Sequence, residues 1–146
     1  MNDEALQKRY LLLTQIASYY PYGLKVEHTK DNETKESYIE GLNIYDVDEE
    51  VIIDDHHLSI YDIKPILRPL SSVAEDEWKE CKQLTCPNGT GIIKIDGLHI
   101  PLNHYGDILS FGFMESIISW CLSNKIDIYN LIRDGLAKPC DSNFYK

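Results

Sequence analysis

The densest group of potentially reactive side chains in the chain is the run Asp54-Asp55-His56-His57. Two carboxylates and two imidazoles could ligate a divalent transition metal or exchange protons near neutral pH. Neighbouring side chains of a strand point to opposite faces, so His56 and His57 cannot both reach one ion unless the turn is distorted. The run is therefore predicted to be a polar hairpin turn, and no metal site is expected there.

A second polar group flanks the loop that follows residue 100 and consists of His99, His104, Tyr105 and Asp107. Catalytic groups often lie on such loops, but no nucleophile accompanies these residues, because the serines of the chain are better explained as helix caps. Gly89-Thr90-Gly91 lacks the glycine, lysine and hydroxyl residue that complete a phosphate-binding loop. No catalytic residue is predicted, and an enzyme is the least supported class of protein.

The four cysteines are too few and too irregularly spaced for a disulfide scaffold; they are Cys81, Cys86, Cys121 and Cys140. Four residues separate Cys81 from Cys86, a spacing found in half of a zinc site, yet no second Cys/His pair with suitable spacing follows. Reduced structural thiols are expected, and no metal or other cofactor is predicted.

The charge balance is strongly acidic: 14 Lys and Arg residues stand against 24 Asp and Glu residues, a formal net charge of −10. Affinity for nucleic acids rests largely on basic side chains that displace counterions, so direct nucleic-acid binding is not expected. No apolar run is long enough to cross a bilayer, and the acidic start Met1–Glu4 does not resemble a secretory signal. The sequence therefore predicts a cytoplasmic protein without membrane contact.

The acids are concentrated between Glu36 and Ile63, where nine Asp and Glu residues occur without a single Lys or Arg. The plainer interpretation is a solvated face that keeps the protein soluble. The sharper hypothesis is an acidic surface that docks on a basic partner, as an inhibitor that imitates DNA would do. The predicted partner-binding residues are Asp46, Asp48, Glu49, Glu50, Asp54 and Asp55.

Three of the ten tyrosines, Tyr19, Tyr20 and Tyr22, cluster where the first predicted helix ends. Tyrosine rings can stack on nucleobases or anchor a protein interface, and these three are the predicted aromatic contact residues. Half-buried positions at helix ends also favour tyrosine, so packing within the protein is the alternative.

A chain of 146 residues with 43% hydrophobic residues fits one globular domain of the α+β class. Residues 1–22 are predicted to contain a helix, and residues 23–70 an antiparallel meander that forms a small curved sheet or SH3-like barrel. Residues 71–137 are predicted to form helices with one β-hairpin. Residues 138–146 are expected to be a loosely held tail.

In the N-terminal half, apolar residues spaced three and four apart predict a helix over Glu4–Tyr20, which Pro21 and Gly23 end. Alternating apolar and polar residues then predict four strands. Their ranges are Leu24–Glu27, Tyr38–Tyr45, Val51–Ile53 and His57–Tyr61, with a charged loop over Thr29–Lys35 and a tight turn at Asp54-Asp55.

In the C-terminal half, two prolines make Lys64–Leu70 an extended segment. Ser72 and Glu75 form the pattern of a capping box before a second helix, and Asp96-Gly97 is the preferred turn of a two-residue β-hairpin. Ser110 is expected to cap a third helix. A last helical turn is predicted from Asp127 to a glycine stop at position 135.

Three segments carry a resemblance: Pro21–Val26, Asp62–Ser72 and Ile126–Ala137, with the motifs YGLKV, DIKPILRPLSS and IDIYNLIRDGLA. Together, and in this order, they resemble a group of small proteins of uncharacterised function carried by phages and mobile elements of gut bacteria. The resemblance implies a bacterial or phage cytoplasmic setting. It implies no activity and no site residues.

The leading hypothesis is a non-enzymatic accessory protein that binds a host or phage protein with a basic surface and inhibits a host system. The alternative is a protein that binds or sequesters a small nucleotide-like ligand. A flat apolar patch rimmed by acids would favour protein binding. A deep pocket with convergent basic donors would favour the ligand, and the candidate donors near the sheet are Lys25, Lys64 and Arg68. No oligomeric state is predicted.

Overall fold

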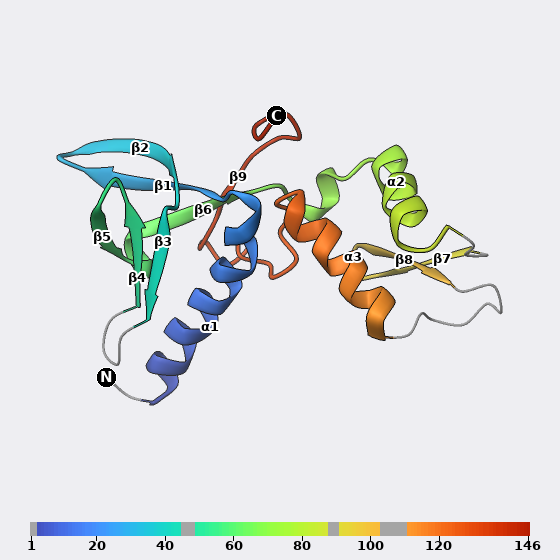
Figure 1. Ribbon diagram of the computed structural model, residues 1–146, viewed down its shortest axis with the longest axis horizontal. Coiled ribbons are helices and arrows are strands. Elements are labelled where there is room, and N and C mark those ends of the chain that lie inside the picture. Colours follow the sequence, from blue (N-terminus) through green and yellow to red (C-terminus); the bar gives the residue numbers. More distant parts are fainter. Residues whose placement is uncertain (1–2, 45–48, 88–90, 103–110) are drawn as a thin grey trace. The chain divides into compact units, whose positions relative to one another are not determined.

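The computed structural model describes residues 3–44, 49–87, 91–102 and 111–146 (Figure 1). The chain divides into two compact units: unit 1 contains Met1–Leu67 and Tyr129–Pro139, and unit 2 contains Arg68–Ile128 and Cys140–Lys146. The predicted α+β class is confirmed, with an N-terminal helix, small antiparallel sheets and C-terminal helices. Within the described ranges, no helix combines the length and the apolar character needed to cross a membrane.

The N-terminal helix α1 spans Asp3–Tyr19 and is followed by the short 3-10 helix η1 at Tyr20–Tyr22. Leu12, Leu13, Ile16 and Tyr19 are buried, and their spacing of three or four residues places them on one face. Gly23 ends the helical segment with φ +81°, and its N–H donates to Tyr20 O at 3.1 Å. The predicted helix and its glycine stop are both confirmed.

The strands that follow form a hairpin where a loop was expected. Strand β1 at Lys25–Lys30 pairs antiparallel with β2 at Glu33–Tyr38, and the turn residues Asp31 and Asn32 have φ values of 54° and 63°. Asp and Asn tolerate this left-handed conformation, which a two-residue hairpin turn requires. The prediction of a charged loop over Thr29–Lys35 was wrong, because β2 is exposed and therefore shows no apolar alternation.

Unit 1 contains two sheets, so the prediction of one continuous meander was also wrong. One sheet has the strand order β2-β1-β6-β9, in which β6 is Ile63–Leu67 and β9 is Lys138–Pro139. The other is the antiparallel meander of β3, β4 and β5, at Gly41–Ile44, Glu49–Ile53 and His56–Ser59.

The chain passes between these sheets at Ile39 and Glu40, inside the segment predicted as one strand over Tyr38–Tyr45. Ile39 N–H donates to Leu24 O at 3.0 Å, and Glu40 N–H donates to Ile52 O at 2.9 Å. Successive N–H groups therefore serve different sheets, and the strand breaks between them.

The predicted loose tail is anchored at its start. β9 pairs in parallel with β6, and Lys138 Nζ lies 2.8 Å from a Glu27 carboxylate oxygen and 3.1 Å from one of Glu36.

The core of unit 1 is made of side chains from α1, both sheets and residues 131–137; it includes Leu13, Ile16, Val26, Val51, Ile53, Ile60, Ile66, Leu67, Leu131 and Ala137.

Unit 2 contains the 3-10 helix η3 at Leu70–Ser72, helix α2 at Glu75–Thr85, strands β7 and β8 at Gly91–Ile95 and Leu98–Leu102, and helix α3 at Phe111–Ser123. The Asp96-Gly97 hairpin turn is confirmed, with φ values of 49° and 86°. Its core gathers side chains from both helices and the hairpin: Val73, Trp78, Cys81, Cys86, Ile100, Ile117, Trp120, Cys121 and Ile126.

Two predictions about helices in the C-terminal half of the chain were wrong. The residue before α2 is Ala74, whose N–H donates to the Glu77 carboxylate at 3.2 Å, while Ser72 Oγ donates to Pro69 O within the 3-10 turn. The segment that starts at Asp127 forms no α-helix; it bends through turns at residues 131–135 and ends at Gly135 with φ +74°. The predicted cap Ser110 lies outside the described residues.

Candidate functional site

The structure describes only part of the predicted acidic surface. Asp46 and Asp48 lie outside the described residues, and only the backbone of Glu49 is described, as the start of β4. Glu50 is hydrogen-bonded within the sheet, since one of its carboxylate oxygens lies 2.7 Å from His57 Nδ1. The remaining two acids form the exposed β4–β5 turn at residues 54 and 55, with φ values of 50° and 62°.

The two adjacent imidazoles have different partners. His56 Nε2 is hydrogen-bonded to Lys30 Nζ from β1, whereas His57 contacts Glu50 on the neighbouring strand. They occupy successive positions of β5, paired with Ile53 and Ile52. Among the described residues, no group of three or more His, Cys, Asp or Glu side chains is placed to hold a metal ion.

Of the three predicted aromatic contact residues, Tyr19, Tyr20 and Tyr22, one is inaccessible to a partner. Tyr19 is fully buried and packs edge to face against Tyr129, with ring centroids 6.0 Å apart. The Tyr20 hydroxyl donates to Glu40 O at 2.8 Å, and the Tyr22 side chain is exposed. Tyr19 is therefore a core residue, because it continues the buried face of α1 that contains Leu13 and Ile16. Of the three predicted contact residues, Tyr20 and Tyr22 can meet a partner.

Unit 1 has an apolar groove of about 360 Å³ that sequence reasoning did not predict. Its lining comes from α1, from the 3-10 helix η2 at Ile60–Asp62 and from residues 129–136: Lys8, Leu11, Leu12, Gln15, Tyr61, Tyr129, Leu131, Asp134 and Leu136. Leu11 is 56% exposed and Tyr61 49% exposed. The groove therefore leaves two large apolar side chains in contact with water.

The charges at the rim of this groove have partners of opposite sign. Lys8 Nζ lies 3.5 Å from a Glu4 oxygen, and Asp134 lies 3.4 Å from Arg133 Nε. The Arg9 guanidinium stands 5.4 Å from the centroid of the Tyr61 ring. Contact at this groove would therefore rest on apolar burial, with charge supplied from elsewhere on the surface.

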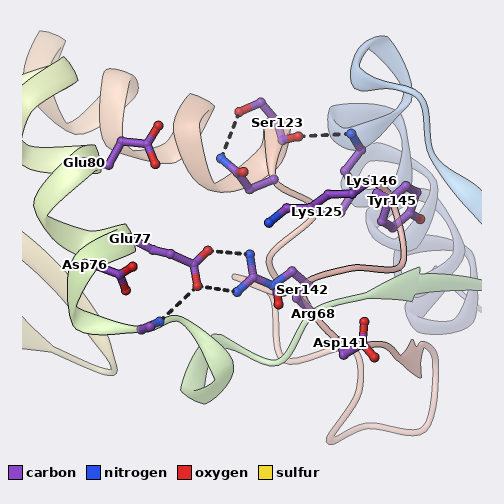
Figure 2. A pocket seen from close by; sticks show the side chains of 12 residues that line it. Arg68, Asp76, Glu77, Glu80, Ser123, Lys125, Asp141, Ser142, Tyr145 and Lys146 are labelled. Atoms are coloured by element: carbon purple, nitrogen blue, oxygen red, sulfur yellow. Dashed lines mark hydrogen bonds and ion pairs between the residues drawn. The ribbon is translucent and has the colours of Figure 1, made fainter.

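Unit 2 has a larger, polar pocket of about 610 Å³ (Figure 2). Helix α2 contributes Asp76, Glu77 and Glu80 to its lining. The end of α3 and the C-terminal segment contribute Ser123, Asn124, Lys125, Asp141, Ser142, Tyr145 and Lys146. Figure 2 shows the three α2 carboxylates on one side of the pocket and both lysines on the other.

Arg68 and Glu77 form the central ion pair of this pocket. The Arg68 Nη1 and Nη2 atoms donate to the two Glu77 carboxylate oxygens at 2.8 and 2.9 Å, and the Arg68 side chain is only 5% exposed. The hydrogen bond from Arg68 holds the pKa of Glu77 below its ordinary value against the opposing effect of burial, and the Ala74 N–H and the charge of Lys146 act in the same direction as Arg68. The backbone also fixes Arg68, because its N–H donates to Lys125 O and its C=O accepts from Asp127 N–H, each at 2.8 Å.

Lys125 occupies the opposite wall. Its ammonium donates to Ser123 O at 3.0 Å and lies 5.0 Å from the centroid of the Tyr145 ring. Partial burial lowers the pKa of Lys125. The ammonium is thus held at the pocket wall by one carbonyl and one aromatic face.

The buried thiols and the second histidine group are structural where they are described. Burial raises the pKa of Cys81 to about 11 and that of Cys121 to about 12, so neither thiol is ionised near neutral pH. His99 stacks on Trp78 with ring centroids 4.6 Å apart, and burial lowers its pKa. The other predicted members of that group, at positions 104, 105 and 107, lie outside the described residues.

Sequence reasoning named Arg68 among the candidate basic donors near the sheet, but it belongs to unit 2 and is already matched by Glu77. Lys25 instead lies over the Tyr38 ring at 4.9 Å, and Lys64 is exposed on β6. Lys125 was not predicted as a site residue. One sequence signal did mark this site: a single arginine inside the otherwise apolar run of residues 66–70 requires a partner when it is buried.

No family model, curated protein or solved structure matches this chain.

Proposed function

We propose that this protein is a non-enzymatic binding protein that holds another protein at the apolar groove of unit 1. The observation that carries the proposal is the exposure of Leu11 and Tyr61 beside a groove of about 360 Å³. Exposed apolar side chains around a concave surface are typical of protein interaction sites. Aromatic anchors such as tyrosine are enriched where such interfaces hold most of their binding energy.

The groove supplies part of an interface. Full burial of a large apolar side chain stabilises a complex by about 1.5–3 kcal/mol, so covering the half-exposed Leu11 and Tyr61 contributes about 1 kcal/mol each. The rest must come from surrounding contacts and charge. A net charge of −10 favours a partner with a basic surface, and the exposed turn at Asp54 and Asp55 offers carboxylates that can steer its approach.

The partner we propose is a host or phage protein with a basic surface, met in the cytoplasm, whose activity is inhibited by the contact. Three features support this choice over a nucleic acid: the excess of acids, the apolar groove and the resemblance of the chain to proteins of phages and mobile elements. A nucleotide-like ligand, the alternative, is less favoured, because the α2 wall of the unit 2 pocket presents carboxylates that repel phosphate groups.

Site-specific photocrosslinking in bacterial cells tests the proposal. The photoreactive residue p-benzoylphenylalanine replaces Leu11 in one variant and Tyr61 in another, and the matched control carries it at Leu84, a 68% exposed residue of α2. We expect the two groove positions to crosslink the same protein and the control position not to do so. Crosslinking of one partner equally at all three positions, or of none at the groove, contradicts the proposal.

The second arm separates apolar contact from charge steering. Leu11→Ser should weaken binding of the purified partner at every salt concentration, whereas the double variant Asp54→Asn, Asp55→Asn should weaken it mainly at low salt, because salt screens exposed charges beyond about 8 Å. Equal binding by both variants and the unmodified protein would show that neither surface is the interface.

A further inference from the structure

The charges that line the unit 2 pocket are distributed unequally by sign. Asp76, Glu77 and Glu80 lie on one side, on α2, while Lys125 and Lys146 lie on the other, together with one acid, Asp141 (Figure 2). A volume of about 610 Å³ lies within the range of small-molecule sites, about 300–1,000 Å³. The pocket therefore lies between an anionic wall on α2 and a cationic wall, on which two lysines outnumber one acid.

The Arg68–Glu77 pair does not take part in ligand recognition. Its bidentate hydrogen bonds satisfy both charges, and the arginine is 5% exposed. The pair closes the wall of the pocket and leaves the other charged groups to face a ligand.

On the anionic wall, Asp76 and Glu80 are exposed and lie four residues apart on α2, so they share one face of the helix. Two carboxylates in this arrangement repel each other. The helix dipole stabilises Asp76, which lies in the first turn, but it does not act in the same way on Glu80, one turn further on. A cation between the two side chains would relieve their repulsion.

On the cationic wall, the Lys125 ammonium carries three N–H donors, one of which is directed at Ser123 O. The Tyr145 ring below it holds the cation in place without neutralising it. A carboxylate can complete this environment through charge-assisted hydrogen bonds. Lys146, on the same wall, adds a second positive charge.

We propose that this pocket binds a small zwitterion of the amino-acid or short-peptide class. Its ammonium group lies between Asp76 and Glu80, and its carboxylate meets Lys125 and Lys146. A simple anion would satisfy the lysines but face the acidic wall, and a simple cation would do the reverse. Only a ligand with both charges at separate ends complements both walls.

A graded series of zwitterions tests this inference. The probes are the unbranched ω-amino acids from glycine to 6-aminohexanoic acid, together with glycylglycine and triglycine. Binding is followed by two-dimensional amide NMR at probe concentrations up to about 10 mM. A dissociation constant of this size corresponds to a binding free energy of about −3 kcal/mol. We expect at least one probe to shift the amide signals of Glu80 and Lys125, with affinity depending on the distance between its charges.

Blocked probes and paired variants identify the contacts. N-acetylation removes the ammonium and amidation removes the carboxylate, and each should weaken binding about tenfold or more. Glu80→Gln and Lys125→Met should have similar effects. The matched controls, Glu75→Gln and Lys94→Met, alter an exposed ion pair of 3.8 Å that does not line the pocket, and they should leave binding unchanged.

Three results would overturn the inference: no probe of the series binds, blocked probes bind as well as free ones, or the control variants weaken binding as much as the pocket variants. Glu80 is exposed, so Glu80→Gln should fold even if Lys125→Met does not. The probes are compared on the purified protein without any partner protein. The outcome therefore does not depend on whether the groove in unit 1 binds another protein.

Discussion

Replacing Glu77 by glutamine measures how strongly the Arg68–Glu77 pair stabilises unit 2. The substitution keeps the size of the side chain but leaves the guanidinium of Arg68, 5% exposed, without its counter-charge. Removing one partner of a buried ion pair costs about 3–5 kcal/mol. The Glu77 side chain is 26% exposed, which lets water reach this side of the pair and places the expected loss at the lower end, about 3 kcal/mol.

Urea denaturation followed by tryptophan fluorescence is the suitable assay, because both tryptophans of the chain, Trp78 and Trp120, lie in the core of unit 2. With a urea dependence of about 2 kcal/mol/M, a loss of about 3 kcal/mol lowers the unfolding midpoint by about 1.5 M. Far-ultraviolet circular dichroism recorded in parallel reports both units. Coincident transitions from the two probes would support the single domain that the sequence predicts.

The effect should also depend on pH in a defined direction. The pKa of Glu77 is lowered from 4.5 in the folded protein, so the folded state favours the ionised form. The pair therefore contributes its full stability above pH 4.5, and this contribution is lost as the pH falls through the lowered pKa. The difference in unfolding free energy between the unmodified protein and Glu77→Gln should shrink below pH 4.5.

The double variant Arg68→Met, Glu77→Met provides the control for the buried charge. This double variant removes both charges. Its loss of stability should therefore be smaller, by about 2 kcal/mol or more, than the sum of the losses caused by Arg68→Met alone and Glu77→Met alone. A loss below about 1 kcal/mol for Glu77→Gln, strict additivity in the double variant, or an effect independent of pH would refute the reasoning.

Three further predictions concern other parts of the chain. Burial lowers the pKa of His99 from 6.5, so the folded state favours the neutral imidazole. The free energy of unfolding should therefore carry the full contribution of neutral His99 above pH 6.5 and lose it as the pH falls through the lowered folded pKa. His99→Gln should remove this dependence of the urea midpoint between pH 7.5 and about 5. Gly97→Ala should destabilise the protein by about 1–2 kcal/mol, because φ is +86° and the added Cβ would lie 2.9 Å from Leu70 Cδ2. Gly135→Ala, with φ +74° and open space around the added Cβ, should destabilise it by about 1 kcal/mol. Thermal or urea melts of the two variants measure both values. Thermal melting with and without a strong chelator should coincide, since the sequence lacks metal-ligand spacing, and a large decrease in melting temperature with chelator would contradict this expectation.

Local signals predicted the parts of the fold that local chemistry determines. The apolar spacing in residues 4–20 specified α1, and the Asp96-Gly97 pair specified the β7–β8 turn, because only a few residue types adopt left-handed conformations easily. The Asp31–Asn32 turn has the same chemistry but stands among charged residues. Without an apolar alternation around it, the hairpin was not recognised.

Features that depend on distant partners could not be predicted. β9 consists of two residues and exists because Lys138 and Pro139 pair with β6, about 70 residues earlier in the chain. The unit 2 pocket brings together Arg68, residues of α2 and the C-terminal segment, whose proximity no sequence period encodes. The acidic run was recognised, but the sequence could not reveal that the Glu50 carboxylate is hydrogen-bonded to His57.

The strand order of unit 1 has a consequence for how the chain folds as it is made. β9 can join β6 only after α2, the β7–β8 hairpin and α3 have left the ribosome, because residues 138–139 follow all of them. Until then, β6 keeps an open edge, and the core positions of Leu131 and Ala137 stay empty. Domains generally fold in the order of their synthesis, but here unit 1 is completed only by residues 129–139, which are synthesised after most of unit 2. The nascent chain therefore exposes an edge strand that a chaperone or a second chain can occupy before folding is complete.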